Sequence, residues 1–323
     1  MPPSSDILSR RRNAGRDESG QYALRGMALL DSALEKFARG LPALAMDEVV
    51  LGLRTLRDED QVRWREFATG ICRHHPIAEL LREDPFTRRS LRKPRGYPGD
   101  PRMLDFIFSP DEIPEGTSDL GASIYGYTTD GPAPRSVRAR AAMTARMIDD
   151  MAGERALRVL GVMAGHLWEA RLSHAAAAGD VEKFLAFDQD ARTLAAIDAS
   201  GLGPGITTYQ GTLRSLFRGK SVFRNFDLIY SPLCDNIPEA TAPRFVSTLF
   251  DALAPGGRLL LSNFAPELLD AGYMEAFMDW HLIYRDEAGL ARLADHLPSD
   301  RIADARTYRD PHGNIVFLDI TRL

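Results

Sequence analysis

The stretch VLGVMAGHLWEA, residues 159–170, decides the fold, because an apolar run passes into a helix through a turn of small residues. Residues 157–162 are apolar over the length of a short buried strand. Gly161, Ala164 and Gly165 leave room for a ligand to approach the backbone, and the helix that follows offers free N–H groups. The stretch therefore predicts the first strand-to-helix turn of a ligand-binding α/β sheet.

A second apolar run, residues 184–187, ends in Asp188, which lies 23 residues beyond Gly165. An acid at the end of the second strand is well placed to bind the hydroxyl pair of a ribose. The alternative is that Asp188 only caps the helix that follows it. Since ligands of a doubly wound sheet bind outside the carboxyl ends of its strands, we expect Asp188 and the first turn to face one ligand.

Strands and helices alternate from residue 155 onward. The expected strands are residues 157–162, 184–187, 206–209, 226–231 and 258–262, followed by a hairpin of 303–307 and 314–321. The expected helices are residues 167–178, 192–199, 240–252, 267–280 and 287–297. This alternation predicts an α/β protein with a Rossmann-like, seven-stranded, doubly wound sheet in residues 135–323, to which the hairpin adds an antiparallel strand.

The preceding part of the chain has a different character. Residues 1–20 are polar and lack the apolar segment of a secretory signal, so we expect a disordered tail. Apolar residues at three- and four-residue spacing then predict a helical region over residues 21–134. Residues 84–100, rich in Pro, Gly and Arg, are expected to form an ordered loop or lid. The expected helices are residues 22–37, 43–56, 61–72, 77–81, 103–108 and 134–151.

Composition excludes several classes of protein. The 323 residues are 44% hydrophobic and 26% charged with a formal net charge of −5, so no nucleic-acid partner is expected. Cys72 and Cys234 are too few for a disulfide framework or a cysteine metal cluster, and His74–His75 have no third ligand nearby. No apolar run approaches the ~20 residues that span a bilayer. We expect a cytoplasmic protein with no metal and no membrane partner.

Four stretches resemble class I S-adenosylmethionine (SAM)-dependent methyltransferases. They are VLGVMAGHLWEA, FLAFDQDARTL (184–194), FDLIYSPLCDNI (226–237) and LAPGGRLLLSNF (253–264). The resemblance covers about residues 135–323. Three further stretches resemble a bacterial branch associated with 3-hydroxypalmitate methyl ester biosynthesis, and they extend the resemblance to about residue 85. They are RKPRGYPGD (92–100), IYGYTTDGPAPRSVRAR (124–140) and DWHLIYRDEAGL (279–290).

The resemblance implies SAM as the cofactor. The residues that it places along SAM, from the methionine part through the ribose to the adenine, are Gly161, Ala164, Gly165, Asp188, Gln189, Thr212 and Leu213. It also implies that Tyr230 and Ser231, at the end of the fourth strand, border the pocket in which the methyl group is transferred.

The first turn departs from the family. Met163-Ala164-Gly165 stands where Gly-Cys-Gly is usual, so Met163 is expected to crowd or reshape the cofactor pocket. Trp168 also stands where smaller or basic residues are usual. It either packs the helix against the sheet or offers a π face to the sulfonium of SAM. Either SAM is bound differently, or its reaction is not ordinary methyl transfer.

Two residues outside these turns are further candidates. Tyr97 lies in the expected lid, where it either contacts the acceptor or belongs to a surface turn. Arg285 would be a carboxylate clamp by family analogy, because its planar fork matches a carboxylate; the alternative is a surface role.

Three functions stay open on this basis. The first is methyl transfer from SAM to a small organic acceptor such as a carboxylate, which needs alignment more than a general base. The second is cyclisation of SAM itself to azetidine-2-carboxylate and methylthioadenosine. The third is a SAM-binding module without catalysis. A hydride-transfer enzyme is excluded by the lack of a second nucleotide half, and a homodimer is left open.

Overall fold

The computed structural model describes residues 5–153, 156–219 and 222–323, with side chains described from residue 19 onward. The chain forms two compact units. The helical unit is Met1–Gly131 with Leu269–His281, and the sheet unit is Pro132–Leu268 with Leu282–Leu323. The sequence-based boundary at residue 135 lies close to the start of the sheet unit, but it does not anticipate that residues 269–281 join the helical unit.

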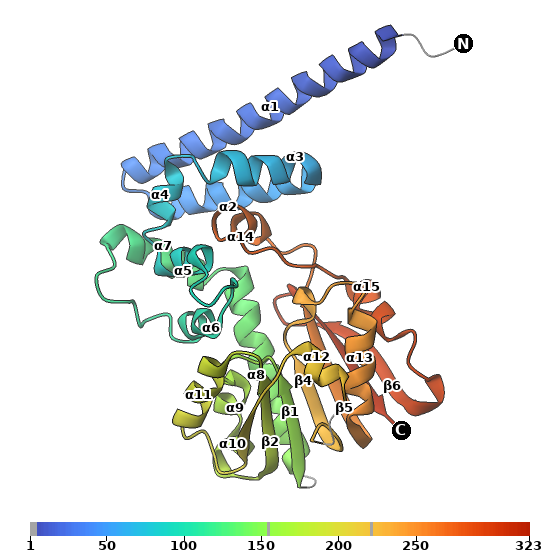
Figure 1. The fold of residues 1–323 in the computed structure, drawn as a ribbon. Helices are drawn as coiled ribbons and strands as arrows, with labels where there is room; N and C mark the ends of the chain where they lie inside the picture. Colours follow the sequence, from blue (N-terminus) through green and yellow to red (C-terminus); the bar gives the residue numbers. More distant parts are fainter. Residues whose placement is uncertain (1–4, 154–155, 220–221) are drawn as a thin grey trace. The chain divides into compact units, whose positions relative to one another are not determined.

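The sheet unit is built on seven strands in the order β3-β2-β1-β4-β5-β7-β6 (Figure 1). The strands β1 to β5 run parallel to one another, and β7 runs antiparallel to both β5 and β6. The order reverses between β1 and β4, which makes their carboxyl ends the topological switch point. The predicted Rossmann-like sheet with an antiparallel strand is confirmed. The strands are β1 (Leu157–Val162), β2 (Val181–Asp188), β3 (Ile206–Gln210), β4 (Phe226–Ser231), β5 (Leu253–Phe264), β6 (Ile302–Arg309) and β7 (Ile315–Arg322).

The central strands are buried along almost their whole length, and every residue of β4 is buried. Parallel strands that helices cover on both faces are buried on both sides, so their sequences are continuous apolar runs. One large core cluster contains Leu160 and Val162 of β1, Ile229 of β4 and Phe245 of a following helix. This core holds the carboxyl ends of β1 and β4 in place, which is where the candidate site lies.

The helices of the sheet unit are shorter than the sequence suggests. The expected helix at residues 167–178 is interrupted, because the Ser173 backbone is extended and its side chain accepts a hydrogen bond from Ala176 N as a new cap. The helix expected at 287–297 ends at Ala291 and continues as a 3₁₀ turn. The helices are α8 (Pro132–Ala152), α9 (Trp168–Leu172), α10 (His174–Ala178), α11 (Ala191–Ala199), α12 (Leu213–Phe217), α13 (Ala242–Asp251) and α15 (Glu287–Ala291).

The helical unit contains a long first helix, α1, that begins at Ser5 and so includes most of the expected disordered tail; residues 1–4 lie outside the described residues. The helix expected at 61–72 changes into a π-helical turn, η1, at Phe67–Cys72. The helices are α1 (Ser5–Ala38), α2 (Pro42–Glu59), α3 (Gln61–Glu66), α4 (Ile77–Leu81), α5 (Pro85–Arg92), α6 (Pro101–Phe108), α7 (Asp119–Thr129) and α14 (Ala271–Phe277).

The expected loop at residues 84–100 is wrong in its first half, which forms α5. Asp84 starts this helix, since its carboxylate accepts hydrogen bonds from the N–H groups of Phe86 (2.8 Å) and Thr87 (2.9 Å). Pro85 at the first helical position loses no hydrogen bond there. An Asp-Pro pair is a helix start as well as a loop signal, and here the helix is formed.

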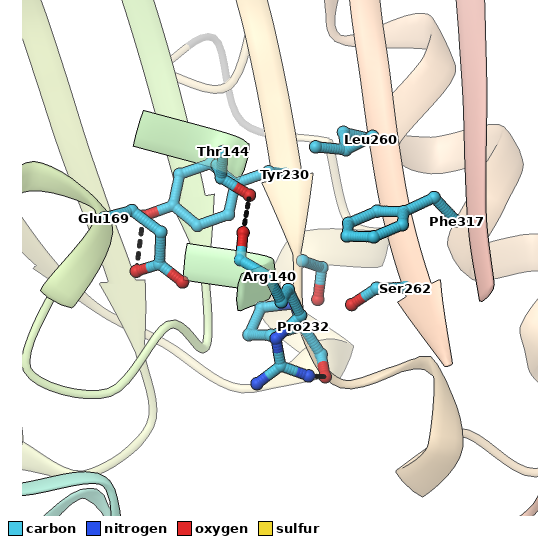
Figure 2. A pocket seen from close by; sticks show the side chains of 9 residues that line it. Arg140, Thr144, Glu169, Tyr230, Pro232, Leu260, Ser262 and Phe317 are labelled. Carbon is cyan, nitrogen blue, oxygen red and sulfur yellow. Dashed lines mark hydrogen bonds between the residues drawn. The ribbon is translucent and has the colours of Figure 1, made fainter. Parts of the chain in front are cut away.

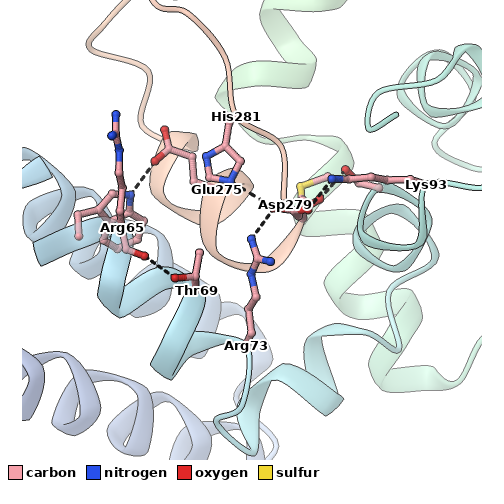
Figure 3. A network of polar contacts seen from close by, with 10 residues as sticks. Arg65, Thr69, Arg73, Lys93, Glu275, Asp279 and His281 are labelled. Atoms are coloured by element: carbon pink, nitrogen blue, oxygen red, sulfur yellow. Dashed lines mark hydrogen bonds and ion pairs between the residues drawn. The ribbon is translucent and has the colours of Figure 1, made fainter. Parts of the chain in front are cut away.

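Residues 269–281 are held in the helical unit by buried and half-buried polar contacts (Figure 3). Both carboxylate oxygens of Glu275 on α14 are used: Arg57 Nε donates to one at 2.9 Å and Trp64 Nε1 to the other at 2.6 Å. Asp279 pairs with Arg73 and Lys93. These contacts explain why a segment that the sequence assigns to the sheet domain belongs to the other unit.

Candidate functional site

The first turn, at the end of β1, has an unusual backbone. Met163, Gly165 and Leu167 all have positive φ, at 54°, 60° and 53°. A left-handed conformation costs a non-glycine residue roughly 1–2 kcal/mol. Met163 N donates to Phe187 O at 2.7 Å, which ties the turn to β2, and the Met163 side chain packs against the core cluster. The Met163 side chain is thus accommodated in the core, while its backbone keeps a conformation that favours glycine.

Gly161 is required by the neighbouring strand. Its register partner is Tyr230 on β4, and a Cβ added at Gly161 would lie 2.8 Å from the Tyr230 hydroxyl oxygen. Real Cβ atoms do not approach that closely, so a side chain at residue 161 would displace Tyr230. Ala164 and Gly165 are both buried. The absence of a side chain at Gly161 therefore leaves room for the Tyr230 side chain on the neighbouring strand.

Asp188 is the last residue of β2 and is buried. Its Oδ1 accepts a hydrogen bond from Asp190 N at 2.9 Å. The N-cap of α11 is Asp190, whose own carboxylate accepts from Arg192 N. The alternative reading, in which Asp188 only caps the following helix, is therefore wrong, because that role belongs to Asp190.

The residues expected beside ribose and adenine come from adjacent loops. Asp188 and Gln210 are register partners at the ends of β2 and β3. Gln210 Nε2 donates to Gln189 O at 3.4 Å, and the Gln189 side chain is exposed. Thr212 precedes α12 without capping it, and Leu213 is half-buried against the core cluster. The ends of β2 and β3 thus bring these residues to one edge of the sheet.

Trp168 begins α9 and is half-buried. The Arg171 guanidinium carbon lies 5.5 Å from the centre of its ring. A cation over the ring is consistent with the aromatic face attracting positive charge. In this structure the cation at the Trp168 ring is therefore Arg171 of the protein itself.

Tyr230 and Ser231, at the end of β4, are both buried. The Tyr230 hydroxyl donates to the Glu169 carboxylate at 3.4 Å, and Ser231 Oγ donates to Val162 O at 3.1 Å. Burial raises the pKa of the Tyr230 phenol well above its usual value, so this group is neutral at ordinary pH. Tyr230 acts as a hydrogen-bond donor here and not as a base.

A small polar cavity lies behind Tyr230, where β4, β5 and β7 meet α8 and α9 (Figure 2). Its volume is about 10 Å³, room for about one water molecule. Arg140 on α8 and Glu169 on α9 carry the ionisable groups in its wall. The lining residues are Arg140, Thr144, Glu169, Tyr230, Ser231, Pro232, Leu260, Ser262 and Phe317.

Sequence reasoning missed Arg140 and Glu169. Both are buried, and burial lowers the pKa of the Arg140 guanidinium and raises the pKa of the Glu169 carboxyl. Nearby Asp235 is also buried, which raises its pKa to about 6. A charged residue in a short helical pattern is normally assigned to the solvent face. The sequence carries no local signal that these two side chains point inward.

Arg285 is placed differently from the expected carboxylate clamp. Its guanidinium is buried and donates through all three nitrogens to groups of the protein itself. Nε bonds Glu239 at 2.9 Å, Nη1 bonds Cys234 O at 2.7 Å, and Nη2 bonds Ile237 O at 2.9 Å. A fourth bond reaches Asn263 Oδ1 at 2.9 Å. Arg285 therefore fixes the loop after β4 to the end of β5.

Tyr97 and the stretch expected to form a lid belong to the helical unit. Tyr97 is half-buried and lies in the turn-rich stretch between α5 and α6, so the segment expected to form a loop or lid is reduced to residues 93–100. Gly96 and Gly99 have positive φ, which accounts for the glycines in this stretch. The structure thus gives Tyr97 and Tyr230 to different units.

In the part of the chain that the structure describes, no three His, Cys, Asp or Glu side chains are grouped so that they could hold a metal ion. Among the helices within the described ranges, none combines the length and apolar character needed to cross a bilayer.

No family model and no curated protein matches the chain. Among solved structures, a possible exported protein from Bordetella parapertussis is similar at 16% identity and a TM-score of 0.53, over 69% of this chain and 79% of that one. This similarity supports the α/β fold. Weaker matches include magnesium protoporphyrin IX methyltransferase (ChlM) from Synechocystis PCC 6803 with bound SAM, at 16% identity and a TM-score of 0.41 over 59% of this chain and 83% of that one. N-methyltransferase NodS from Bradyrhizobium japonicum WM9 matches at 13% identity and a TM-score of 0.41, over 58% and 97%.

Proposed function

We propose that this protein is a SAM-dependent methyltransferase that acts on a small organic acceptor, and that the acceptor group is a carboxylate. The observation that carries the proposal is the placement of Asp188. It is a buried acid at the end of β2, next to the turn that follows β1, and it is relieved of helix capping by Asp190. Acids in that position recognise the hydroxyl pair of a ribose.

The residues around Asp188 fit the remaining parts of SAM. The loops after β2 and β3 present Thr212 and Leu213 for an adenine ring. The small residues Ala164 and Gly165 leave the backbone of the first turn open to the methionine part. Bound SAM supplies an electrophilic methyl group. The protein holds the donor, aligns the acceptor and excludes water at the ends of β1 and β4.

A carboxylate acceptor suits the protonation states of this site. An ionised carboxylate is already nucleophilic and needs no base to remove a proton. Tyr230 is held neutral by burial, so it can donate a hydrogen bond but cannot accept a proton from the acceptor. The narrower resemblance to 3-hydroxypalmitate methyl ester biosynthesis stays a prediction, as do a cytoplasmic location and a homodimer.

The test is to incubate the purified protein with SAM alone and then with a panel of carboxylic acids, and to identify the nucleoside product by mass spectrometry. We expect S-adenosylhomocysteine to form only when an acceptor is present. Methylthioadenosine formed without an acceptor would replace the proposal with SAM cyclisation. If SAM does not bind at all, the protein is neither enzyme.

A further inference from the structure

The strand β6 forms an open edge of the sheet. It is last in the strand order, and its hydrogen-bonded neighbour among the described residues is β7 (Figure 1). With eight residues it is longer than β3, the five-residue strand at the opposite edge. The consecutive residues Ala303, Asp304, Ala305 and Arg306 are all exposed. A long exposed edge presents backbone groups that can pair with a strand of another chain.

The hydrogen bonds of the hairpin show which backbone groups of β6 face outward. Asp310 N donates to Ile315 O at 2.9 Å, and these two residues continue the register between β6 and β7. Hydrogen-bonded pairs alternate with unbonded pairs along an antiparallel ladder, so β6 bonds to β7 through its even-numbered residues. The N–H and C=O groups of Ala305 and Thr307 therefore point away from β7. Both side chains are small, which lets another strand approach.

The charged side chains of this edge are not arranged to keep another strand away. Charges that project from an edge strand normally block pairing. Arg306 instead bonds to the buried Asp319 on its own hairpin, through Nε at 3.3 Å and Nη2 at 3.1 Å. Arg309 is held in the same way by Glu287. The exposed carboxylate of Asp304 forms neither a hydrogen bond nor an ion pair with the described residues.

Asp304 and Arg306 are complementary to a second copy of β6. Two copies of one strand that are related by a two-fold axis run antiparallel. If Ala305 lies opposite its own copy, Asp304 of each chain lies opposite Arg306 of the other, whose Nη1 is not used by Asp319. A pair centred on Asp304 or on Arg306 would place like charges directly opposite each other, which is unfavourable. The register centred on Ala305 therefore satisfies both the outward backbone groups and the charges.

We propose that the protein forms a homodimer through β6, with the two strands antiparallel and Ala305 on the two-fold axis. The N–H and C=O groups of Ala305 bond to those of its copy, and Thr307 pairs with Ala303 of the other chain. Asp304 and Arg306 form an ion pair on each side of the axis. The two seven-stranded sheets then continue into each other. This dimer is independent of the proposed function, because β6 carries no residue assigned to SAM or to the acceptor.

Sedimentation equilibrium of the full chain measures the association. We expect a monomer–dimer equilibrium whose dissociation constant rises with salt, since the ion pairs lie at the surface. Asp304→Arg should raise the dissociation constant at least tenfold, because it places two guanidinium groups opposite each other on both sides of the axis. Glu182→Arg is the matched control: it makes the same change of charge at an exposed residue of β2, away from this edge, and leaves the constant unchanged.

Disulfide formation tests the register. Ala305→Cys should form an intermolecular disulfide under mild oxidation, because the Cα atoms of a directly opposite, hydrogen-bonded pair lie about 5.5 Å apart. Thr307→Cys should remain reduced, because the same residue of the other chain lies four positions along the strand, roughly 14 Å away. The two native cysteines are buried, so a cross-link comes from the introduced side chain.

Each outcome decides for or against the β6 dimer. A protein that sediments as a monomer at every concentration overturns it. So does a dimer whose dissociation constant is the same in Asp304→Arg, because that dimer uses another surface. Equal cross-linking of Ala305→Cys and Thr307→Cys overturns it as well, since no single register brings both positions together. The substituted residues are exposed or half-buried, and thermal unfolding followed by circular dichroism confirms that each variant is folded.

Discussion

Two buried arginines of the sheet unit have opposite surroundings. The Arg285 guanidinium makes hydrogen bonds through all three nitrogens, while the Arg140 guanidinium donates one hydrogen bond among the described residues. Replacing a buried charge that lacks a partner by an apolar side chain of similar size removes its desolvation penalty, and breaking a satisfied network leaves other groups unbonded. A buried arginine is therefore expected to stabilise the fold at residue 285 and to destabilise it at residue 140.

We predict opposite effects of the same substitution at these positions. Arg140→Met should leave the free energy of unfolding of the ligand-free protein unchanged or raise it by about 1–3 kcal/mol. Arg285→Met should lower it by about 3 kcal/mol or more, because carbonyls of Cys234 and Ile237 lose their donor. Urea unfolding of both variants measures this. Equal destabilisation would contradict the view of Arg140 as unpaired.

Asp188 gives a second residue-scale prediction, with a matched control in the same loop. Asp188→Asn should weaken SAM binding about 10- to 100-fold, because charge-assisted hydrogen bonds to a ribose are each worth roughly 1.5–3 kcal/mol. Asp190→Asn should leave SAM affinity nearly unchanged, since Asn caps a helix almost as well as Asp. Calorimetry on both variants decides; equal affinities would remove Asp188 from the site.

Asp235 provides a prediction about pH. Burial raises its pKa from 3.8 to about 6, so the folded protein holds this proton more tightly than the unfolded chain does. The stabilisation from this proton is complete below about pH 4 and is lost as the pH rises through about 6. Asp235→Asn, which stays neutral, should therefore match the wild type near pH 4 and exceed it in stability at pH 7, by up to about 3 kcal/mol.

The measurement is urea unfolding of both proteins at several values of pH. Asp300→Asn, at an exposed position, controls for the loss of one negative charge. A difference between Asp235→Asn and wild type that does not change between pH 4 and pH 7 would refute the raised pKa of Asp235.

At the scale of helices and strands, the sequence predicted the elements that have a clear apolar pattern. The strands β1 and β4 were predictable because parallel strands are apolar throughout. Asp188 was predictable because it ends such a strand. α5 was missed because Asp84-Pro85 also marks loops, and Arg140 and Glu169 were missed because a helical pattern does not reveal which charged side chain a second helix will cover.

The cap of α5 can be tested against a more exposed cap of the same chemistry. Asp84 accepts from two backbone N–H groups and from Thr128 Oγ1 at 3.0 Å, all within a buried environment. Asp60 caps α3 in the same way but is only half-buried. Asp84→Ala should lower the free energy of unfolding by about 2–3 kcal/mol, and Asp60→Ala should lower it by less. Thermal and urea unfolding should rank them in that order.

At the scale of the whole molecule, the helical unit is not one continuous stretch of chain. It is completed by Leu269–His281, whose Glu275 is the buried acceptor for Arg57 and Trp64. A fragment of residues 1–131 should therefore fail to unfold cooperatively, and fusion of residues 269–281 to it should restore a cooperative transition. Circular dichroism during heating measures both. A cooperative transition in the shorter fragment would show that Glu275 is dispensable.

The helical unit is formed by two separate segments of the chain, and this limits how the gene can recombine. Recombination that exchanged only the part encoding residues 1–131 would separate Arg57 and Trp64 from Glu275, which is encoded far downstream. The downstream segment would in turn arrive in a sheet domain without the side chains that bury it. A lineage could therefore acquire a new helical unit only if both coding segments were exchanged together, so the two are expected to share one ancestry even where the sheet between them diverges.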